Sequence, residues 1–255
     1  MHLEYARRAR SALFAPRPRL DGPRAAGTPR ERGQRHTGTT ILALRFDTGI
    51  MLAADRQITG YNAIMSDECV KIERITDSSA LLSCGLVSSG QYIEDALKVH
   101  CRSFNEMTGY ELSIRGQLQF TANLAREACA WYGWENWSFG GILAGAEVDE
   151  TFSLYGIGDD GARDTPAHFT ADGSGFRFAR TVLQMRWRPN LTHPEALRVA
   201  MEALYYAGRN DLYTSDLRTT TPTAASVKAD GLGFVDEAAV RAMADDVIAT
   251  AGRYL

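Results

Sequence analysis

The sequence has few of the features that mark several large classes of protein. No apolar run reaches the ~18 residues that a membrane-spanning helix needs, and there is no basic excess, because the formal net charge of the 255 residues is −3 at pH 7. Cysteine is scarce and shows no C-x-x-C or histidine-paired spacing, so disulfides and zinc sites are not expected. We interpret the thiols as those of a reducing compartment, with the cytoplasm as the expected location. They are Cys69, Cys84, Cys101 and Cys129.

Lysine is absent from residues 1–38, where acidic residues are also rare. This leader carries nine arginines against three acids, a balance of +6, whereas residues 39–255 carry 19 basic and 28 acidic side chains, a balance of −9. The net negative charge of residues 39–255 argues against a nucleic-acid-binding surface, which needs a basic patch. The leader also holds four of the eight prolines and few apolar residues. It therefore buries too little surface to become ordered.

Composition leaves three interpretations of the leader. An arginine-rich, acid-poor start is typical of an organelle transit peptide. A nucleic-acid-binding arm would also be basic, but interleaved aromatic residues are missing. A removable propeptide explains why this composition stops at Gly38-Thr39-Thr40. We favour the third, with residues 1–38 as a disordered basic propeptide and residues 39–255 as the folded domain.

Cleavage between Gly38 and Thr39 would place a base and a nucleophile on one residue. The freed α-amine of Thr39 titrates near ~7.7–8.0, so it is a suitable base at neutral pH, while an unassisted hydroxyl is inert there. An N-terminal threonine is one known way to activate a hydroxyl. The absence of a side chain at Gly38 suits a step in which the backbone must contort.

Hydrophobic patterning after the leader predicts an α+β fold. Two apolar runs, 41–46 and 50–54, surround an Asp-Thr-Gly turn and indicate a hairpin. Because the runs are nearly continuous, both faces of their sheet should be covered. Further strands are expected within 63–74 and at 80–84, 140–145, 151–156, 223–228 and 233–235. Helices are expected from a cap at Ser88 or Ser89, and at 118–131, 176–186, 194–208 (ending at Gly208) and 237–251. Hairpins alternating with helix pairs favour a four-layer αββα sandwich.

An ordered set of short stretches resembles a known family, the catalytic β subunits of 20S proteasomes, most nearly those of the bacterial, actinobacterial type. The resemblance covers residues 38 to about 235, and Asp55 and Lys71 follow Thr39 at intervals of sixteen residues. The main stretches are Gly38-Thr39-Thr40-Ile41, Ala53-Ala54-Asp55-Arg56, Val70-Lys71-Ile72, Gly173-Ser174-Gly175 and Asp211-Leu212-Tyr213-Thr214-Ser215, with 197–205 and 222–231 in addition. The fold it implies is that of the N-terminal-nucleophile hydrolases.

The resemblance implies a threonine endopeptidase that matures by self-cleavage at Gly38–Thr39. Thr39 would attack the scissile carbonyl. Lys71 would lie beside its hydroxyl, help its proton to move, and lower the pKa of the amine by like-charge repulsion. Asp55 would keep Lys71 charged and oriented. The backbone N–H of Gly85 would stabilise the oxyanion.

The residues implied around the freed amine are Ser174, Asp211 and Thr214. Those implied around the substrate side chain before the cut are Ile58, Cys69, Ser83 and Val87. None of these four is charged, which predicts a preference for apolar residues of small to medium size. The family pattern calls for no metal or organic cofactor. It implies two seven-membered β rings between α rings, an ATPase regulator and unfolded protein substrates, with no nucleic acid and no membrane.

Three other functions stay open at this point. The two-ring, ATP-dependent threonine protease of the same fold usually has Gly-Asp-Gly where this chain has Ala54-Asp55-Arg56. A non-catalytic structural ring subunit generally lacks the threonine, the lysine or the glycine. An amidohydrolase of the same N-terminal-nucleophile group would need an assay to distinguish. The chain also departs from the pattern at Gln57, where a basic residue is usual, and at 86–89, where small residues are usual.

Overall fold

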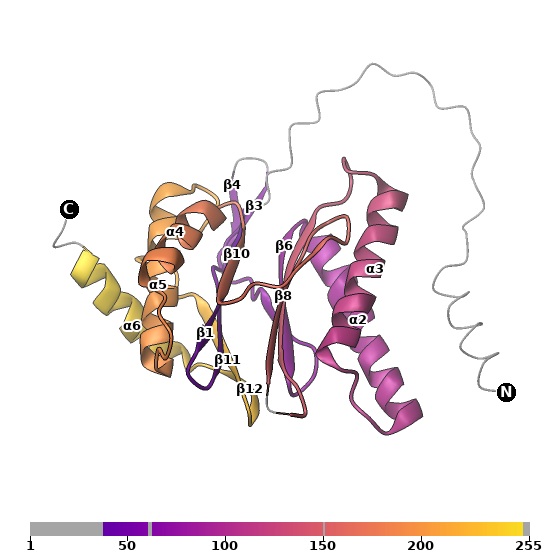
Figure 1. The fold of residues 1–255 in the computed structure, drawn as a ribbon. Coiled ribbons are helices and arrows are strands. Elements are labelled where there is room, and N and C mark those ends of the chain that lie inside the picture. Colours follow the sequence, from indigo (N-terminus) through magenta and orange to yellow (C-terminus); the bar gives the residue numbers. More distant parts are fainter. Residues whose placement is uncertain (1–37, 61–62, 150, 252–255) are drawn as a thin grey trace, which may run out of the picture. The chain divides into compact units, whose positions relative to one another are not determined.

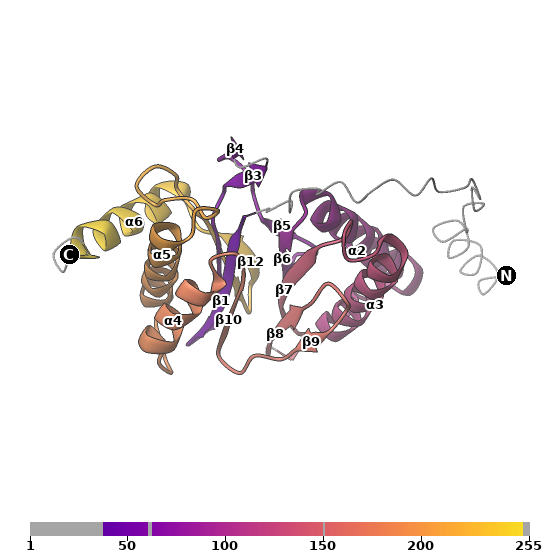
Figure 2. The same ribbon diagram turned by 90° about the horizontal axis from the view of Figure 1, so that it is seen from above.

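The computed structural model describes residues 38–60, 63–149 and 151–251, so the propeptide prediction lies, except for Gly38, outside the described residues. Within them, two five-stranded sheets stack face to face between two layers of helices. Figure 1 shows these four layers from the side and Figure 2 shows them from above. The predicted αββα sandwich is confirmed.

The first sheet has the strand order β10-β1-β2-β11-β12, and all its neighbouring strands are antiparallel. Its strands are β1 (Thr40–Phe46), β2 (Gly49–Ala54), β10 (Phe169–Gly173), β11 (Thr223–Lys228) and β12 (Gly231–Phe234). Its outer face is covered by α4 (Phe176–Arg186), α5 (His193–Asn210) and α6 (Glu237–Ala251).

The second sheet has the order β5-β6-β7-β8-β9 and is also antiparallel. Its strands are β5 (Ile72–Arg74), β6 (Ser79–Gly85), β7 (Phe139–Ala146), β8 (Phe152–Ile157) and β9 (Arg163–Asp164). Its outer face is covered by α2 (Val87–Thr108) and α3 (Ile114–Tyr132). A separate hairpin of β3 (Ile58–Gly60) and β4 (Ala63–Ser66) follows β2.

The continuous apolar run of β1 is explained by burial on both faces. Leu42 and Leu44 pack with α5 in the outer core, while Ile41 and Ala43 pack between the two sheets. Successive side chains of a strand point to opposite faces, so a strand between two cores needs apolar residues at every position. Polar side chains are therefore expected just outside the strands, and Thr39 and Asp55 lie there, directly before β1 and directly after β2.

Several sequence-based boundaries were wrong. Helix α2 begins at Val87 with Leu86 as its N-cap, so neither Ser88 nor Ser89 caps it. Helix α5 continues past Gly208 to Asn210, and Gly208 instead serves close packing, since a Cβ atom on it would lie 2.3 Å from the carbonyl oxygen of Ser215. Strands β3, β9 and β10 were not predicted. They are two to five residues long, too short to show a clear periodicity.

Candidate active site

Thr39 lies immediately before β1 and is only 5 % exposed. Its side-chain Oγ1 donates a hydrogen bond to the carbonyl oxygen of Gly38 at 2.6 Å, and its N–H donates to Ser174 Oγ at 3.2 Å. Gly38 is itself held in place, because its N–H donates to Thr59 Oγ1 of β3 at 2.7 Å. The threonine hydroxyl is therefore fixed beside the carbonyl group of the preceding peptide bond.

Gly38 occupies a position that has no room for a side chain. A Cβ atom there would lie 1.8 Å from Cβ of Tyr213 and 2.3 Å from the Tyr213 carbonyl oxygen. Real Cβ atoms essentially never come within 3.0 Å of such atoms, and backbone cannot swing aside as a flexible side chain can. The segment containing Tyr213 thus requires glycine before the threonine.

Asp55, at the end of β2, is 1 % exposed and accepts five hydrogen bonds. Its Oδ1 accepts from Thr40 N–H and Lys71 Nζ, both at 2.7 Å. Its Oδ2 accepts from the N–H of Gln57 at 2.9 Å, and from the N–H and Oγ of Ser215 at 3.2 and 3.0 Å. A buried carboxylate is stable only when its lone pairs are satisfied, and here both oxygens are.

Lys71 is 6 % exposed and donates to the backbone carbonyl of Gln57 at 2.6 Å as well as to Asp55. The predicted pairing of Asp55 with Lys71 is present as a buried ion pair. Lys71 and Thr39 both line one pocket, although no hydrogen bond joins their side chains in the described part of the chain. The lysine is thus oriented by the carboxylate and by Gln57, the residue that departs from the family pattern.

A second polar network surrounds the nitrogen of Thr39. The hydroxyls of Ser174 and Thr214 both donate to Asp211 Oδ2, at 2.5 and 2.6 Å. The proton of Thr214 is therefore committed to the carboxylate, which makes Thr40 the donor in the 2.7 Å contact between the two threonine hydroxyls. Ser174 in turn accepts from the nitrogen of Thr39. The three residues implied by resemblance do come together.

Gly85 ends β6 with φ +99°, a conformation that favours glycine, and lines the same pocket as Thr39. A Cβ atom at this position would lie 2.5 Å from the carbonyl oxygen of Ser138. Gly85 thus lets β6 turn sharply beside Thr39.

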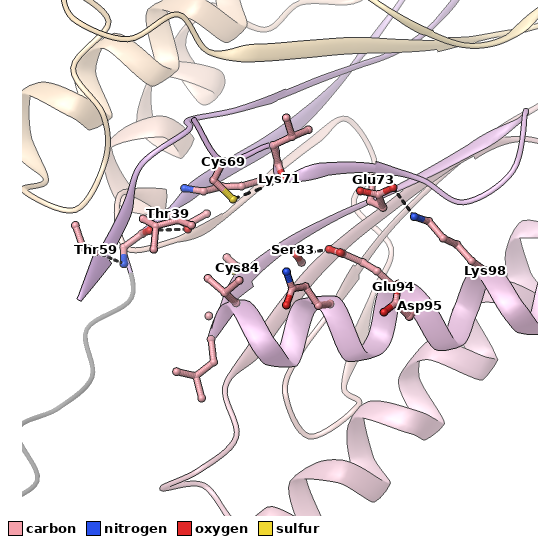
Figure 3. Close-up of a pocket in the computed structure, with 17 residues that line it drawn as sticks. Thr39, Thr59, Cys69, Lys71, Glu73, Ser83, Cys84, Glu94, Asp95 and Lys98 are labelled. Atoms are coloured by element: carbon pink, nitrogen blue, oxygen red, sulfur yellow. Dashed lines mark hydrogen bonds and ion pairs between the residues drawn. The ribbon is translucent and has the colours of Figure 1, made fainter. Parts of the chain in front are cut away.

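The pocket beside Thr39 has a volume of about 480 Å³ and lies between β3 and the segment leading into β5 on one side, and β6 and helix α2 on the other (Figure 3). The four residues predicted to surround it, Ile58, Cys69, Ser83 and Val87, all line it. It also contains Lys71, which the sequence predicted beside Thr39, and four charged residues that sequence reasoning missed, namely Glu73, Glu94, Asp95 and Lys98. The expected apolar preference rested on an incomplete lining.

Two thiols border this pocket, and burial raises the pKa of both. Cys69 is partly exposed, while Cys84 is buried and also close to the carboxylate of Asp172, which raises its pKa further. A raised pKa keeps a thiol protonated and weakly nucleophilic. Neither thiol is therefore a strong candidate for a nucleophile in this pocket.

Other polar residues of the site were also missed. Ser215 and Thr40 hydrogen bond to the two networks, and Thr59 fixes Gly38. Ser215 and Thr40 belong to the stretches that resemble the family, so their position next to Thr214 and Thr39 could have identified them as site residues. No feature of the sequence marked Thr59. The described residues hold no group of three or more His, Cys, Asp or Glu side chains suited to a metal ion, and none of their helices is long and apolar enough to cross a membrane.

The sequence matches a known family and several of its named members. Residues 35–219 match the family described as proteasome subunit. The chain is similar to proteasome subunit beta 2 of Thermomonospora curvata, with 32% identity over 215 residues, 83% of this chain and 76% of the relative. It is 27% identical to proteasome subunit beta of Jonesia denitrificans over 226 residues, covering 83% and 71% of the two chains. Proteasome subunit beta 1 of Thermococcus onnurineus is 29% identical over 181 residues, 70% and 85% of the two. The chain therefore belongs to the proteasome subunit family, alongside relatives named as β subunits.

Proposed function

We propose that the chain is the precursor of a threonine endopeptidase, the catalytic β subunit of a 20S proteasome core particle. One observation carries the proposal: the Thr39 hydroxyl lies 2.6 Å from the carbonyl oxygen of Gly38, at the edge of a pocket of substrate size. The same hydroxyl that is poised at its own preceding peptide bond would, once the bond is cut, face incoming peptides.

Maturation would begin when Thr39 Oγ1 attacks the carbonyl carbon of Gly38. The Gly38–Thr39 C–N bond breaks, the hydroxyl proton passes to the departing nitrogen, and the leader is left as an ester on Oγ1. Water then hydrolyses the ester, which releases residues 1–38 with a terminal carboxylate and restores the hydroxyl. The lack of space for any side chain at Gly38 supports this site of cleavage.

In turnover, the freed amine of Thr39 would take the hydroxyl proton as Oγ1 attacks a substrate carbonyl, and would return it to the leaving amine. Ser174, Asp211 and Thr214 would hold this amine through the network that now binds the Thr39 nitrogen. Lys71, held by Asp55, would keep a positive charge close by, which lowers the pKa of the amine. The N–H of Gly85 would bind the oxyanion.

Proteasome β subunits assemble with other proteasome subunits. For this chain we propose two seven-membered β rings between α rings, fed by an ATPase regulator with unfolded proteins in the cytoplasm. The segment up to Gly38 would then be a propeptide that keeps the nucleophile blocked until assembly. A ring subunit that assembles without cutting is the main alternative.

The test is to co-express the full chain with its α partner and to measure intact mass and N-terminal sequence of the assembled particle. Three forms are compared: wild type, Thr39→Ala and Thr39→Ser. We expect wild type and Thr39→Ser to begin at residue 39 and to hydrolyse peptides, because serine keeps the hydroxyl. Thr39→Ala should retain its leader and be inactive.

Two results would contradict the proposal. An assembled wild type that hydrolyses peptides with every leader still attached would exclude the freed amine as the base. An assembled wild type that is neither processed nor active would favour the structural ring subunit.

A further inference from the structure

The charged residues of the pocket are not spread evenly along it. Thr39 and Thr59 lie at one end in Figure 3, whereas Glu94, Asp95 and Lys98 project from α2 at the other. Ser83 of β6 lies between these groups and its small side chain does not close the pocket. A long substrate side chain that enters beside Thr39 would therefore point toward α2.

Both lysines that line the pocket already have an ion-pair partner. Lys71 is paired with Asp55, which is buried behind the pocket wall, and Lys98 is paired with Glu73. Among the described residues, Glu94 and Asp95 have no ion-pair partner. The end of the pocket at α2 thus carries an excess of negative charge.

The Glu94 carboxylate is held in place. Its Oε1 accepts a hydrogen bond from the Ser83 hydroxyl at 2.6 Å, and this is the only hydrogen bond to it within the described residues. Gly90 packs close to this pair, since a Cβ atom on it would lie 2.6 Å from Ser83 Oγ. Asp95, in contrast, is exposed on the next position of α2, where water screens its charge. Glu94 is therefore the oriented and partly desolvated acid of the pair.

An occupant with a positive charge would complete this site. Burial raises the pKa of Glu94, with Glu73 and Asp95 acting in the same direction and Ser83 and Lys98 in the opposite one. The free pocket therefore disfavours the carboxylate charge. An apolar side chain would desolvate that carboxylate further without compensation, whereas an ammonium or guanidinium group would supply both the charge and the hydrogen-bond donors that it lacks.

We infer that Glu94, oriented by Ser83, determines specificity by selecting peptides that carry lysine or arginine at the residue whose carbonyl is attacked. The inference rests on the proposed peptidase function and replaces the apolar preference expected from Ile58, Cys69, Ser83 and Val87. The aliphatic stem of a long cationic side chain would still contact Ile58 and Val87.

The test uses the assembled particle and four fluorogenic peptides that differ only at the residue before the cut: lysine, arginine, norleucine and glutamate. Norleucine matches the length of the lysine stem without its charge. We expect kcat/KM for lysine to exceed that for norleucine by at least ~10-fold, as for a charge-assisted hydrogen bond. Glu94→Gln, nearly identical in shape, should remove most of this ratio. Asp95→Asn removes the same formal charge from the neighbouring residue and should leave the ratio largely unchanged.

A lysine-to-norleucine ratio near one in the wild type, or a ratio that Glu94→Gln leaves unaltered, overturns the inference while the peptidase function stands. A particle that cleaves none of the peptides instead counts against the proposed function. In that event, the wild-type particle is titrated calorimetrically with product peptides that end in lysine or norleucine. Tighter binding of the lysine product still supports the inference, and equal binding overturns it.

Discussion

Asp55 and Glu94 are both carboxylates beside the same pocket, and they differ in how completely they are satisfied. Asp55 is 1 % exposed and accepts five hydrogen bonds, one of them from Lys71 in the pocket wall. Glu94 is partly exposed and, from the described residues, accepts one hydrogen bond, donated by Ser83. Both carboxylate oxygens of Asp55 thus have hydrogen-bond partners within the fold, whereas the carboxylate of Glu94 can still accept hydrogen bonds from a further partner.

This difference in hydrogen bonding suits the two carboxylates to different tasks within the proposed site. Groups that hold Thr39, the proposed nucleophile, need fixed geometry, and a saturated buried network supplies it because every alternative position would break several hydrogen bonds. A group that must discriminate among side chains needs free hydrogen-bonding capacity for the substrate itself. If saturation and burial are what distinguish the two regions, substitutions in them should differ sharply in effect.

Asp55→Asn should have the largest effect. It leaves the Lys71 ammonium buried without its counter-charge and turns an amide NH₂ toward donors that previously faced an oxygen. Breaking a buried ion pair by removing one partner typically costs about 3–5 kcal/mol. We expect a loss of stability of that size by urea unfolding, with processing abolished. A variant that unfolds at the wild-type urea concentration would contradict the view that this network is saturated for structural reasons.

Gly38→Ala should slow self-cleavage without affecting the mature enzyme. The added Cβ meets the backbone of Tyr213, and a barrier raised by only about 1.4 kcal/mol already slows the step tenfold. Processing is followed by intact mass after assembly. Once residues up to 38 are removed, the variant and wild-type products have the same sequence, so activity per processed N-terminus should be equal. Cleavage at the wild-type rate would show that the tight packing at Gly38 does not matter for the reaction.

Ser215→Ala should have an intermediate effect on the same network. It deletes the hydroxyl that donates to Asp55, and it leaves the N–H of Arg56 without the acceptor it has at 3.1 Å. The N–H of Ser215 still donates to Asp55, so four of the five hydrogen bonds remain. We expect a loss of about 1–3 kcal/mol in urea unfolding. A loss as large as that of Asp55→Asn would mean that the hydroxyl, rather than the ion pair, is the main support.

The fold was largely predictable because its strongest signals are long and periodic. The hairpin of β1 and β2 and helices α4 and α6 follow from apolar spacing, and both ends of α4 and α6 were placed correctly. Strand β10 was missed although it pairs with β1 and is directly followed by Ser174. Its five residues have no alternation that distinguishes a strand from a loop.

The site was predictable only where a local motif marked it. Asp55, Lys71 and Asp211 lie in short stretches with a family resemblance, and the structure brings each to the expected partner. Glu94 lies in the middle of an amphipathic helix, where an acidic residue normally faces solvent. Only the packing of α2 against β6 turns it toward Ser83, and no spacing rule within the sequence reports that contact.

The pH dependence of selectivity should be smaller but diagnostic. Because the pKa of Glu94 is raised above its ordinary value of 4.5, the carboxyl gains its charge at a higher pH than an exposed glutamate. The ratio of lysine to norleucine cleavage should therefore rise as pH increases through that pKa and should be flat in Glu94→Gln. Titration of the Thr39 amine affects both peptides alike and cancels in the ratio. A flat wild-type ratio between pH 4 and 8 would contradict a titrating carboxylate in the pocket.

Glu237→Gln should have the smallest effect, and it provides the matched control for Asp55→Asn. Arg56 is the next residue after Asp55, yet its ion pair with Glu237 lies at the surface, with Glu237 73 % exposed and a 3.4 Å separation. Such pairs contribute at most about 1 kcal/mol and are screened by salt, whereas a buried pair is screened far less. Urea unfolding at 0.1 and 1 M NaCl should therefore show a small, salt-sensitive loss for Glu237→Gln and a large loss for Asp55→Asn that salt hardly alters. Equal losses of stability from the two substitutions would mean that burial is not what makes the Asp55 region rigid. The buried Asp55–Lys71 pair and the exposed Arg56–Glu237 pair would then contribute alike.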